Sequence, residues 1–243
     1  MKLQRRRKEG VIIKKFRNEW KYILSNQEIT LLKSRISKVL NYDSHTNNGK
    51  YIIHSLYFDD YKNYSSHTTY SGVSKRFKWR IRYYNNNLDY IVLERKEKRF
   101  SRCHKKSCKL TLDEYNLIFS GNILDLLYIT KKELIKELAR DILLYDYKPK
   151  VIIDYERIAF VEEITNVRIT FDMKISVSNE IDKFIDGDYI KYYINQSNVN
   201  VLEVKFDDIL PSYIKKIVES YEFKQTSFSK YFYGRKIINS YYS

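Results

Sequence analysis

Charged residues occupy every second position in several segments of this chain, and apolar residues fill the positions between them. In the segment 16–23, for example, Glu19 and Lys21 alternate with Trp20 and Tyr22. Successive side chains of a β-strand point to opposite faces of a sheet, so the pattern predicts one apolar and one charged face. The charged face would carry Arg17, Glu19 and Lys21; Lys78, Arg80 and Arg82; Glu94 and Lys96; Arg157; Arg168 and Asp172; and Glu203 and Lys205.

The charged face is mostly basic. One interpretation is an ordinary half-buried sheet whose polar face meets water. Like charges that lie opposite each other on neighbouring strands are destabilising, however, so a face with this many cations needs an anion to neutralise it. The net charge of the whole chain supports the same conclusion, because its 45 Lys and Arg residues exceed its 30 Asp and Glu residues by 15. We therefore favour a basic sheet face that binds an anion.

Carboxylates also stand among these cations, at Glu19, Glu94, Asp172 and Glu203. Carboxylates beside phosphate-binding cations suit a divalent metal that bridges the protein and a polyphosphate. In their other role, they would pair with neighbouring Lys and Arg side chains and hold them in place. For Glu19 and Glu94, both roles stay open.

Glycine is scarce, which limits how this chain can bind phosphate. With 6 Gly and 2 Pro, the sequence contains neither G-x-x-x-x-G-K-[ST] nor G-x-G-x-x-G, so side chains must take the place of a backbone phosphate cradle. Cys103, His104 and Cys108 make a poor zinc site, because no second Cys or His cluster completes it. No convincing pair of nucleophile and base stands out either.

Strands dominate the predicted secondary structure. They are expected at 16–23, 50–58, 73–84, 88–98, 148–161, 167–176 and 200–206, with a hairpin turn at 85–87. Capping boxes predict helices that begin after Ser25, Thr111 and Thr130, and Pro211 opens a further amphipathic helix. The helices stand between hairpins and not in strict βαβ alternation, so the predicted fold class is α+β.

A series of short motifs carries a family resemblance. The motifs are Arg17-x-Glu19-x-Lys21-Tyr22, Ser55-Leu56-Tyr57-Phe58-Asp59, Lys78-x-Arg80-x-Arg82, Leu93-Glu94-x-Lys96, Tyr155-x-Arg157, Val167-Arg168-Ile169-Thr170-Phe171-Asp172, Leu202-Glu203-Val204-Lys205 and Phe228-Ser229-Lys230-Tyr231. With these motifs the chain resembles the VTC domain, the polyphosphate polymerase branch of the triphosphate tunnel metalloenzymes in the CYTH-like superfamily, over 16–235.

The resemblance implies a closed antiparallel β-barrel of about eight strands that forms a basic tunnel, with helices packed outside. The charged residues would then face into the tunnel, and the apolar residues would face outward under the helices. In VTC domains the tunnel binds the triphosphate of ATP together with Mn²⁺ or Mg²⁺. The γ-phosphoryl group passes to the end of a growing polyphosphate chain, and ADP leaves.

The resemblance also assigns roles to residues. Glu203 is expected to bind the metal. Ser227 and Ser229 are expected to touch phosphate or to cap a helix. His54 either faces the tunnel or is a buried structural residue. The residues implied to contact phosphate are Lys21, Arg80, Arg82, Lys96, Arg157, Arg168, Lys205 and Lys230.

The first motif departs from the E-x-E-x-K pattern of hydrolytic tunnel enzymes, because Arg17 takes the first acidic position. The absence of a carboxylate at this position weakens the case for a two-metal site that activates water, and so favours transfer to phosphate over hydrolysis. The first hypothesis is therefore a metal-dependent polyphosphate polymerase that uses ATP. The second is a tunnel triphosphatase that hydrolyses tripolyphosphate or nucleoside triphosphates, and the third is a non-catalytic polyphosphate-binding module. We expect no specific nucleic-acid partner.

We predict a single domain at 16–235, between a basic N-terminal tail at 1–15 and a C-terminal tail at 236–243. The tail lacks the apolar core of a secretory signal, and no apolar run reaches the roughly 18 residues of a membrane span. We therefore expect a cytoplasmic protein with reduced thiols. Two arrangements stay open: the chain acts alone, or its basic tail associates peripherally with a membrane protein at the membrane surface. The choice of metal and the oligomeric state also stay open.

Overall fold

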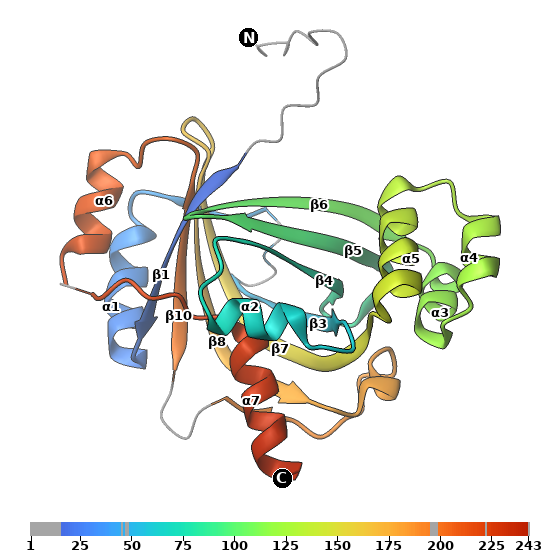
Figure 1. Cartoon of the computed structure of the whole chain (residues 1–243). Helices are drawn as coiled ribbons and strands as arrows, with labels where there is room; N and C mark the ends of the chain where they lie inside the picture. Colours follow the sequence, from blue (N-terminus) through green and yellow to red (C-terminus); the bar gives the residue numbers. More distant parts are fainter. Residues whose placement is uncertain (1–15, 45, 47–48, 195–198, 222, 243) are drawn as a thin grey trace, which may run out of the picture.

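Eight antiparallel strands close into a ring in the computed structural model, which describes residues 16–44, 46, 49–194, 199–221 and 223–242 (Figure 1). The predicted closed barrel is thus confirmed, and the predicted tail at 1–15 lies outside the described residues. Short strands β2 (Asn41–Tyr42) and β9 (Tyr192–Tyr193) extend the sheet beside the ring. The order around the ring is β7 (Lys148–Glu162), β3 (Tyr51–Asp59), β4 (Lys75–Tyr84), β5 (Asn87–Arg99), β6 (Arg102–Leu110), β1 (Arg17–Leu24), β10 (Asn200–Phe206) and β8 (Val167–Ser178), which pairs back with β7.

The ring is not a uniform barrel, because β1 and β6 meet over a short stretch. Only Arg17 and Asn18 of β1 pair with β6, whereas all of β1 from residue 18 onward pairs with β10. Side chains complete the contact beyond that stretch. Glu19 of β1 accepts hydrogen bonds from Lys96 of β5 and from Cys103 of β6. The ring therefore depends at this seam on polar side chains that lie inside it.

Helices cover the outside of the ring on two sides (Figure 1). On one side α1 (Asn26–Ile36) and α6 (Ser212–Glu219) pack together near β1 and β10. On the other side α3 (Leu112–Ser120), α4 (Ile123–Ile129) and α5 (Glu133–Tyr145) pack near β5 and β6. The remaining helical segments are α2 (Tyr64–Tyr70), the 3₁₀ turn η1 (Ile181–Lys183) and α7 (Lys230–Tyr242). No helix within the described ranges is long and apolar enough to cross a membrane.

The apolar face of the sheet forms the contact with these helices, as the alternation of residues predicted. One core cluster joins the apolar residues of β4 and β5 to α3, α4 and α5, and includes Trp79, Ile81 and Leu93. A second cluster joins those of β8 and β10 to α1 and α6, and includes Phe171 and Leu202. Because both clusters lie outside the ring, the charged alternate positions point inward.

A third apolar cluster closes one side of the ring's interior. Helix α7 packs against β7 and β8, and Tyr231 lies in one cluster with Tyr155 and Ile153. The contact is tight at Gly234, where a Cβ atom would come within 3.0 Å of Val177 Cγ1. The first turn of α7 thereby lies against the interior of the ring, and Lys230 and Tyr231 face the charged residues.

Several local predictions are confirmed, because short-range signals decide them. The capping boxes at Ser25 and Thr111 both form, each with a Glu three residues later. Asn85 and Asn86 join β4 and β5 with φ values of 48° and 57°. A two-residue hairpin turn of this kind requires positive φ angles, which Asn tolerates better than most residues.

Other local predictions are wrong. Thr130 ends α4 instead of opening a helix, because its hydroxyl donates a hydrogen bond to the Glu114 carboxylate at 3.0 Å. The next helix, α5, begins at Glu133. Strand β6 and helices α2 and α4 were not predicted. Helix α7 runs through residue 242, where a C-terminal tail was expected from 236.

Candidate functional site

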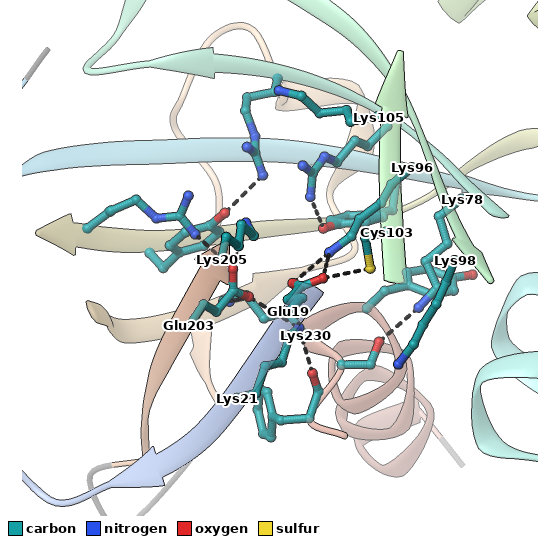
Figure 2. Close-up of a pocket in the computed structure, with 18 of the residues that line it drawn as sticks. Glu19, Lys21, Lys78, Lys96, Lys98, Cys103, Lys105, Glu203, Lys205 and Lys230 are labelled. Carbon is teal, nitrogen blue, oxygen red and sulfur yellow. Dashed lines mark hydrogen bonds and ion pairs between the residues drawn. The ribbon is translucent and has the colours of Figure 1, made fainter. Parts of the chain in front are cut away.

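The interior of the ring holds a cavity of about 1050 Å³ that is lined mainly by Lys, Arg and Tyr side chains (Figure 2). Every residue that the sequence assigned to phosphate or metal lines this cavity, and so do Ser227 and Ser229. The structure therefore brings the predicted site residues together, although their chemical roles stay predictions. They are Lys21, Arg80, Arg82, Lys96, Arg157, Arg168, Glu203, Lys205 and Lys230.

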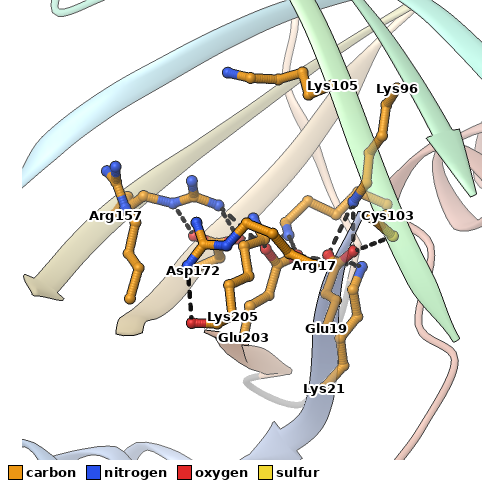
Figure 3. A network of polar contacts seen from close by, with 12 residues as sticks. Arg17, Glu19, Lys21, Lys96, Cys103, Lys105, Arg157, Asp172, Glu203 and Lys205 are labelled. Carbon is orange, nitrogen blue, oxygen red and sulfur yellow. Dashed lines mark hydrogen bonds and ion pairs between the residues drawn. The ribbon is translucent and has the colours of Figure 1, made fainter. Parts of the chain in front are cut away.

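Glu203 lies at the centre of the largest group of cations (Figure 3). Its carboxylate oxygens lie 3.2 Å from Lys21 Nζ and 3.0 Å from Lys205 Nζ. Lys230 Nζ lies 3.4 Å away, and Arg157 Nη2 lies 3.8 Å away. Burial by itself would raise the pKa of Glu203, but Lys205 and Lys21 hold this pKa well below its ordinary value. Glu203 is therefore ionised across the physiological pH range.

Glu19 forms a second anionic centre beside the first. Both its oxygens accept hydrogen bonds from Lys96 Nζ, at 2.9 and 2.8 Å, and Cys103 Sγ donates at 2.8 Å. Lys21 Nζ lies 3.6 Å from Glu19 and 3.2 Å from Glu203, and so stands between the two carboxylates. Burial opposes ionisation of Glu19, but Lys96 and Lys21 hold its pKa well below the ordinary value.

Asp172 anchors the buried end of the cation group. Its carboxylate accepts from Arg157 Nε at 2.5 Å and from Arg157 Nη2 at 2.7 Å, in the two-pronged geometry that a guanidinium allows. Lys230 Nζ lies 2.5 Å from the second oxygen. Asp172 is fully buried, so the orientation of Arg157 and Lys230 is fixed before any ligand arrives.

Glu94 acts as a positioning residue for the arginines of β4. It is 1% exposed, and its oxygens lie 2.6 Å from Arg80 Nη2 and 2.6 Å from Lys105 Nζ. Arg82 is held by the Tyr155 hydroxyl at 2.9 Å and the Ser55 hydroxyl at 3.1 Å. The structure thus shows the ion-pairing role that the sequence left open for Glu94.

Arg17 and Arg168 extend the charged group toward the edge formed by β8 and β10. Arg17 Nε lies 3.1 Å from the Asp207 carboxylate, and Arg17 also donates to the carbonyl of Asn166. Arg168 Nη2 lies 2.6 Å from Asp43 and donates to the Tyr51 hydroxyl at 3.0 Å. Arg17, at the first charged position of the β1 motif, thus pairs outside the Glu19–Glu203 group.

Some lining residues were not assigned by the sequence. Lys105 and Cys103 belong to β6, which was not predicted to be a strand. Lys78, which the alternation placed on the charged face without a binding role, also lines the cavity, and Arg76 and Lys98 continue the predicted alternation of β4 and β5 by one step. The period-two pattern could therefore have found Arg76 and Lys98 too, whereas β6 gives no comparable signal.

His54 does not face the cavity, so that alternative is wrong. In β3 the cavity is lined by Tyr51 and Tyr57, and the even-numbered His54 points to the outer face. His54 stacks on Tyr83, and its Nδ1 lies 3.0 Å from the buried Asp154 carboxylate. His54 is therefore a buried structural residue beneath the segment that carries Tyr189, which was the other of the two predictions for it.

Glu19 and Glu203, the two carboxylates beside Lys21, are the residues of this cavity that could hold a divalent cation. No group of three or more His, Cys, Asp or Glu side chains in the described part of the chain could enclose a metal by itself. Glu203 and Glu19 nevertheless supply hard oxygen ligands from two adjacent strands. Mg²⁺ is commonly held by one or two carboxylates plus substrate phosphates, and that arrangement suits these residues.

A match to one solved structure supports the fold. A structure described as a "putative adenylate cyclase" from Bacillus halodurans matches with a TM-score of 0.53 and 13% identity, over 89% of this chain and 95% of that chain. The PH1819 protein from Pyrococcus horikoshii matches with a TM-score of 0.45 and 13% identity, over 92% and 99%. No curated protein sequence matches the chain. At 13% identity, the match to the Bacillus halodurans structure shows the fold alone.

The sequence model of one family settles the assignment. The VTC domain model matches residues 16–239, which include every strand of the ring and nearly all of α7. The match agrees with the motifs on β1, β4, β5, β7, β8 and β10, whose charged residues meet in the cavity. The chain belongs to the VTC domain family.

Proposed function

We propose that this protein is a polyphosphate polymerase that transfers the γ-phosphoryl group of ATP to a growing polyphosphate chain. The observation that carries the proposal is the cavity inside the ring, where cations from seven strands and α7 surround two ionised carboxylates. Such a cavity suits a linear polyanion, because each phosphate can meet a different Lys or Arg side chain. Membership of the VTC family supports the same choice of substrate.

The cations of the cavity would act in two ways, some as fixed groups and others as groups that adjust to the ligand. Arg157 and Lys230 are nearly buried and pinned by Asp172, so they offer a preorganised positive field. Lys96 and Lys205 are more exposed to the cavity and can follow the phosphates. Phosphoryl transfer depends mainly on such positioning and charge neutralisation, so the chain needs no covalent nucleophile.

The reaction would exchange one phosphorus–oxygen bond for another. A terminal oxygen of the polyphosphate chain attacks the γ-phosphorus, the bond to the β-phosphate bridging oxygen breaks, and ADP leaves with that oxygen. Glu203, assisted by Glu19, would hold a divalent Mn²⁺ or Mg²⁺ ion, which supplies charge neutralisation on the phosphates when bound. Lys21 lies between these carboxylates and would neutralise charge on the transferred group.

The test is a product assay. The pure protein is incubated with ATP and either Mn²⁺ or Mg²⁺, the products are separated on a gel stained for polyphosphate, and ADP and orthophosphate are measured in parallel. We expect polymer to appear together with a matching amount of ADP. Orthophosphate without polymer would instead indicate a tunnel triphosphatase. Bound ATP or polyphosphate without turnover would indicate a binding module.

Lys205 gives the proposed site a specific pH dependence. Burial lowers the pKa of Lys205 from 10.5 to about 8, although Glu203 and Glu19 oppose that effect. A neutral Lys205 cannot neutralise phosphate. We therefore expect the Kd for tripolyphosphate to rise roughly threefold to tenfold between about pH 7 and about pH 9.

The stability of the ligand-free protein should change in the opposite direction over the same range. Below about pH 8, Lys205 is charged in both the folded and the unfolded chain, so the destabilisation from holding this charge in the cavity is fully present. Above this pH the folded protein binds fewer protons than the unfolded chain, so the free energy of unfolding rises. Lys205→Arg keeps the charge at all these pH values and is expected to remove its share of both effects. An unchanged pH profile in Lys205→Arg would contradict the assignment.

A further inference from the structure

One end of the cavity holds cations that have no carboxylate partner among the described residues. Arg76 and Lys78 of β4 and Lys98 of β5 line this end, and all three are half-buried. Figure 2 shows Lys78 and Lys98 together, on the side away from Lys205. Elsewhere in the cavity each major cation contacts a carboxylate, as Lys96 contacts Glu19. This end therefore carries positive charge that the described protein does not itself neutralise.

The pairing of the two strands places these cations directly against other cations. In the register of β4 and β5, Arg76 lies opposite Lys98, and Lys78 lies opposite Lys96. Like charges in such positions destabilise a sheet. Burial, followed by neighbouring cations such as Lys21, lowers the pKa of Lys78 well below its ordinary value, and burial and Arg76 lower that of Lys98. The arrangement thus works against folding stability.

The polar contacts that these cations make are with neutral groups. Lys78 Nζ lies 2.9 Å from the Ser229 hydroxyl, and Arg76 donates to the carbonyl of Val73. Asp59 is the carboxylate that acts on Lys78 most strongly, but its oxygens already accept from the Tyr231 hydroxyl at 2.6 Å and from backbone N–H groups of residues 60, 65 and 66. Asp59 is therefore occupied and does not pair with Lys78.

The opposite end of β4 and β5 is lined by uncharged side chains. There the cavity is lined by Tyr84 and Tyr90, whose ring centroids lie 6.3 Å apart, and by Asn87. The β4–β5 ladder thus runs from aromatic and amide groups, through the cations that pair with Glu94 and Glu19, to the unpaired cations. A linear phosphate chain that fills the paired region must continue beyond it. Of the two ends of the β4–β5 ladder, the Arg76 end is the one where the described residues offer further cations without a carboxylate partner.

We propose that Arg76, Lys78 and Lys98 form an additional anion subsite, which holds phosphates of the polyphosphate chain beyond the three that the central cations bind. The inference rests on the proposed function, because it takes linear polyphosphate as the ligand. The subsite would give the protein a higher affinity for long chains than for tripolyphosphate. In a polymerase it would retain the chain between successive transfers.

The test compares two ligands and four proteins. Binding of tripolyphosphate and of a long-chain polyphosphate, at equal molar concentration of chains, is measured by calorimetry with the wild type, Lys98→Gln and the double variant Arg76→Gln/Lys98→Gln. Lys75→Gln is the matched control, because it removes the same charge from the neighbouring position of β4, whose side chain points to the other face. Thermal unfolding without ligand is measured for each protein.

We expect wild type and Lys75→Gln to bind the long chain more tightly than tripolyphosphate. The double variant should lose about tenfold in affinity for the long chain, with tripolyphosphate binding unchanged, as removal of charge-assisted hydrogen bonds implies. Lys98→Gln should unfold at the same or a higher temperature, because one repulsive contact is relieved. The stability measurement also shows whether each variant is folded when its binding is compared.

Three outcomes would overturn the proposal. Equal affinity of the wild type for both ligands would show that no subsite exists beyond the triphosphate. An equal loss for both ligands in the double variant would assign these cations to the triphosphate site, and no loss would show that they do not bind phosphate. Failure of the proposed reaction is distinguishable from these results, because a protein that makes no polymer can still show the dependence on chain length.

Discussion

Glu203→Gln is expected to reduce polymer formation by at least about a hundredfold while tripolyphosphate binding is retained. The substitution conserves shape but removes the negative charge at the centre of Lys21, Lys205 and Lys230. Without it, the cavity is more positive, so an anion should bind as well as before or more tightly. Turnover should nevertheless fall, because the amide is a far weaker ligand for a divalent cation and no longer fixes the lysines.

The measurements for this variant are polymer yield from ATP and calorimetric binding of tripolyphosphate. Glu156→Gln is the matched control, because Glu156 lies on β7 and pairs with Lys50 and Lys174 outside the cavity. We expect the control to keep both activities. Full polymer synthesis by Glu203→Gln would mean that Glu203 only pairs with cations. Loss of binding together with turnover would mean that it organises the phosphate site instead of acting in the transfer.

Much of the fold could be predicted because the alternation of residues decides which face of each strand is buried. Trp79 and Ile81 face the helices, whereas Arg80 and Arg82, at the alternate positions, face the cavity. A strand has only two faces, so one good pattern fixes the direction of every side chain on it. The same argument could have placed His54 outside the ring, because the odd-numbered Tyr51 and Tyr57 of β3 face inward.

Strand β6 shows why the rest could not be predicted. Its sequence from Arg102 to Leu110 is polar on both faces, so it lacks the apolar half of the alternation. On one face, Lys106 forms an ion pair with Glu137 of α5. On the other face, Lys105 forms an ion pair with Glu94 of β5. Both contacts join residues of different elements, 11 and 31 positions apart. No local pattern reports them, and Lys105 was therefore missed as part of the site.

The pairing of charges inside the ring was likewise beyond the sequence. Glu19 and Glu94 look alike in the pattern, since each precedes a lysine by two positions. In the structure Glu94 is enclosed by Arg80 and Lys105, whereas Glu19 lies beside Lys21 and the second carboxylate, Glu203. The difference arises from which strands become neighbours when the ring closes.

Asp172→Asn is expected to lower the free energy of unfolding by about 3–5 kcal/mol, which corresponds to a decrease in melting temperature of roughly 6–20 °C. Asp172 is fully buried, and its carboxylate contacts Arg157 in two places and Lys230 in a third. Removing that charge leaves two buried cations with Glu203 as their nearest remaining counter-charge. The control is Asp146→Asn, at an exposed pair with Lys148, where the expected change is within about 1 kcal/mol.

Tripolyphosphate should restore much of this loss, because its negative charge can replace that of Asp172 for Arg157 and Lys230. A ligand that binds only the folded protein stabilises it by about 2.7 kcal/mol at a concentration a hundred times its Kd. If phosphate takes over the charge of Asp172, the variant should bind tripolyphosphate at least as tightly as the wild type. At equal ligand concentration its melting temperature should then rise by more than that of the wild type. A variant that is destabilised but gains no more from tripolyphosphate than Asp146→Asn would show that phosphate does not reach Arg157 and Lys230. In that case these two cations would serve the fold, and the phosphate site would be confined to the more exposed lysines.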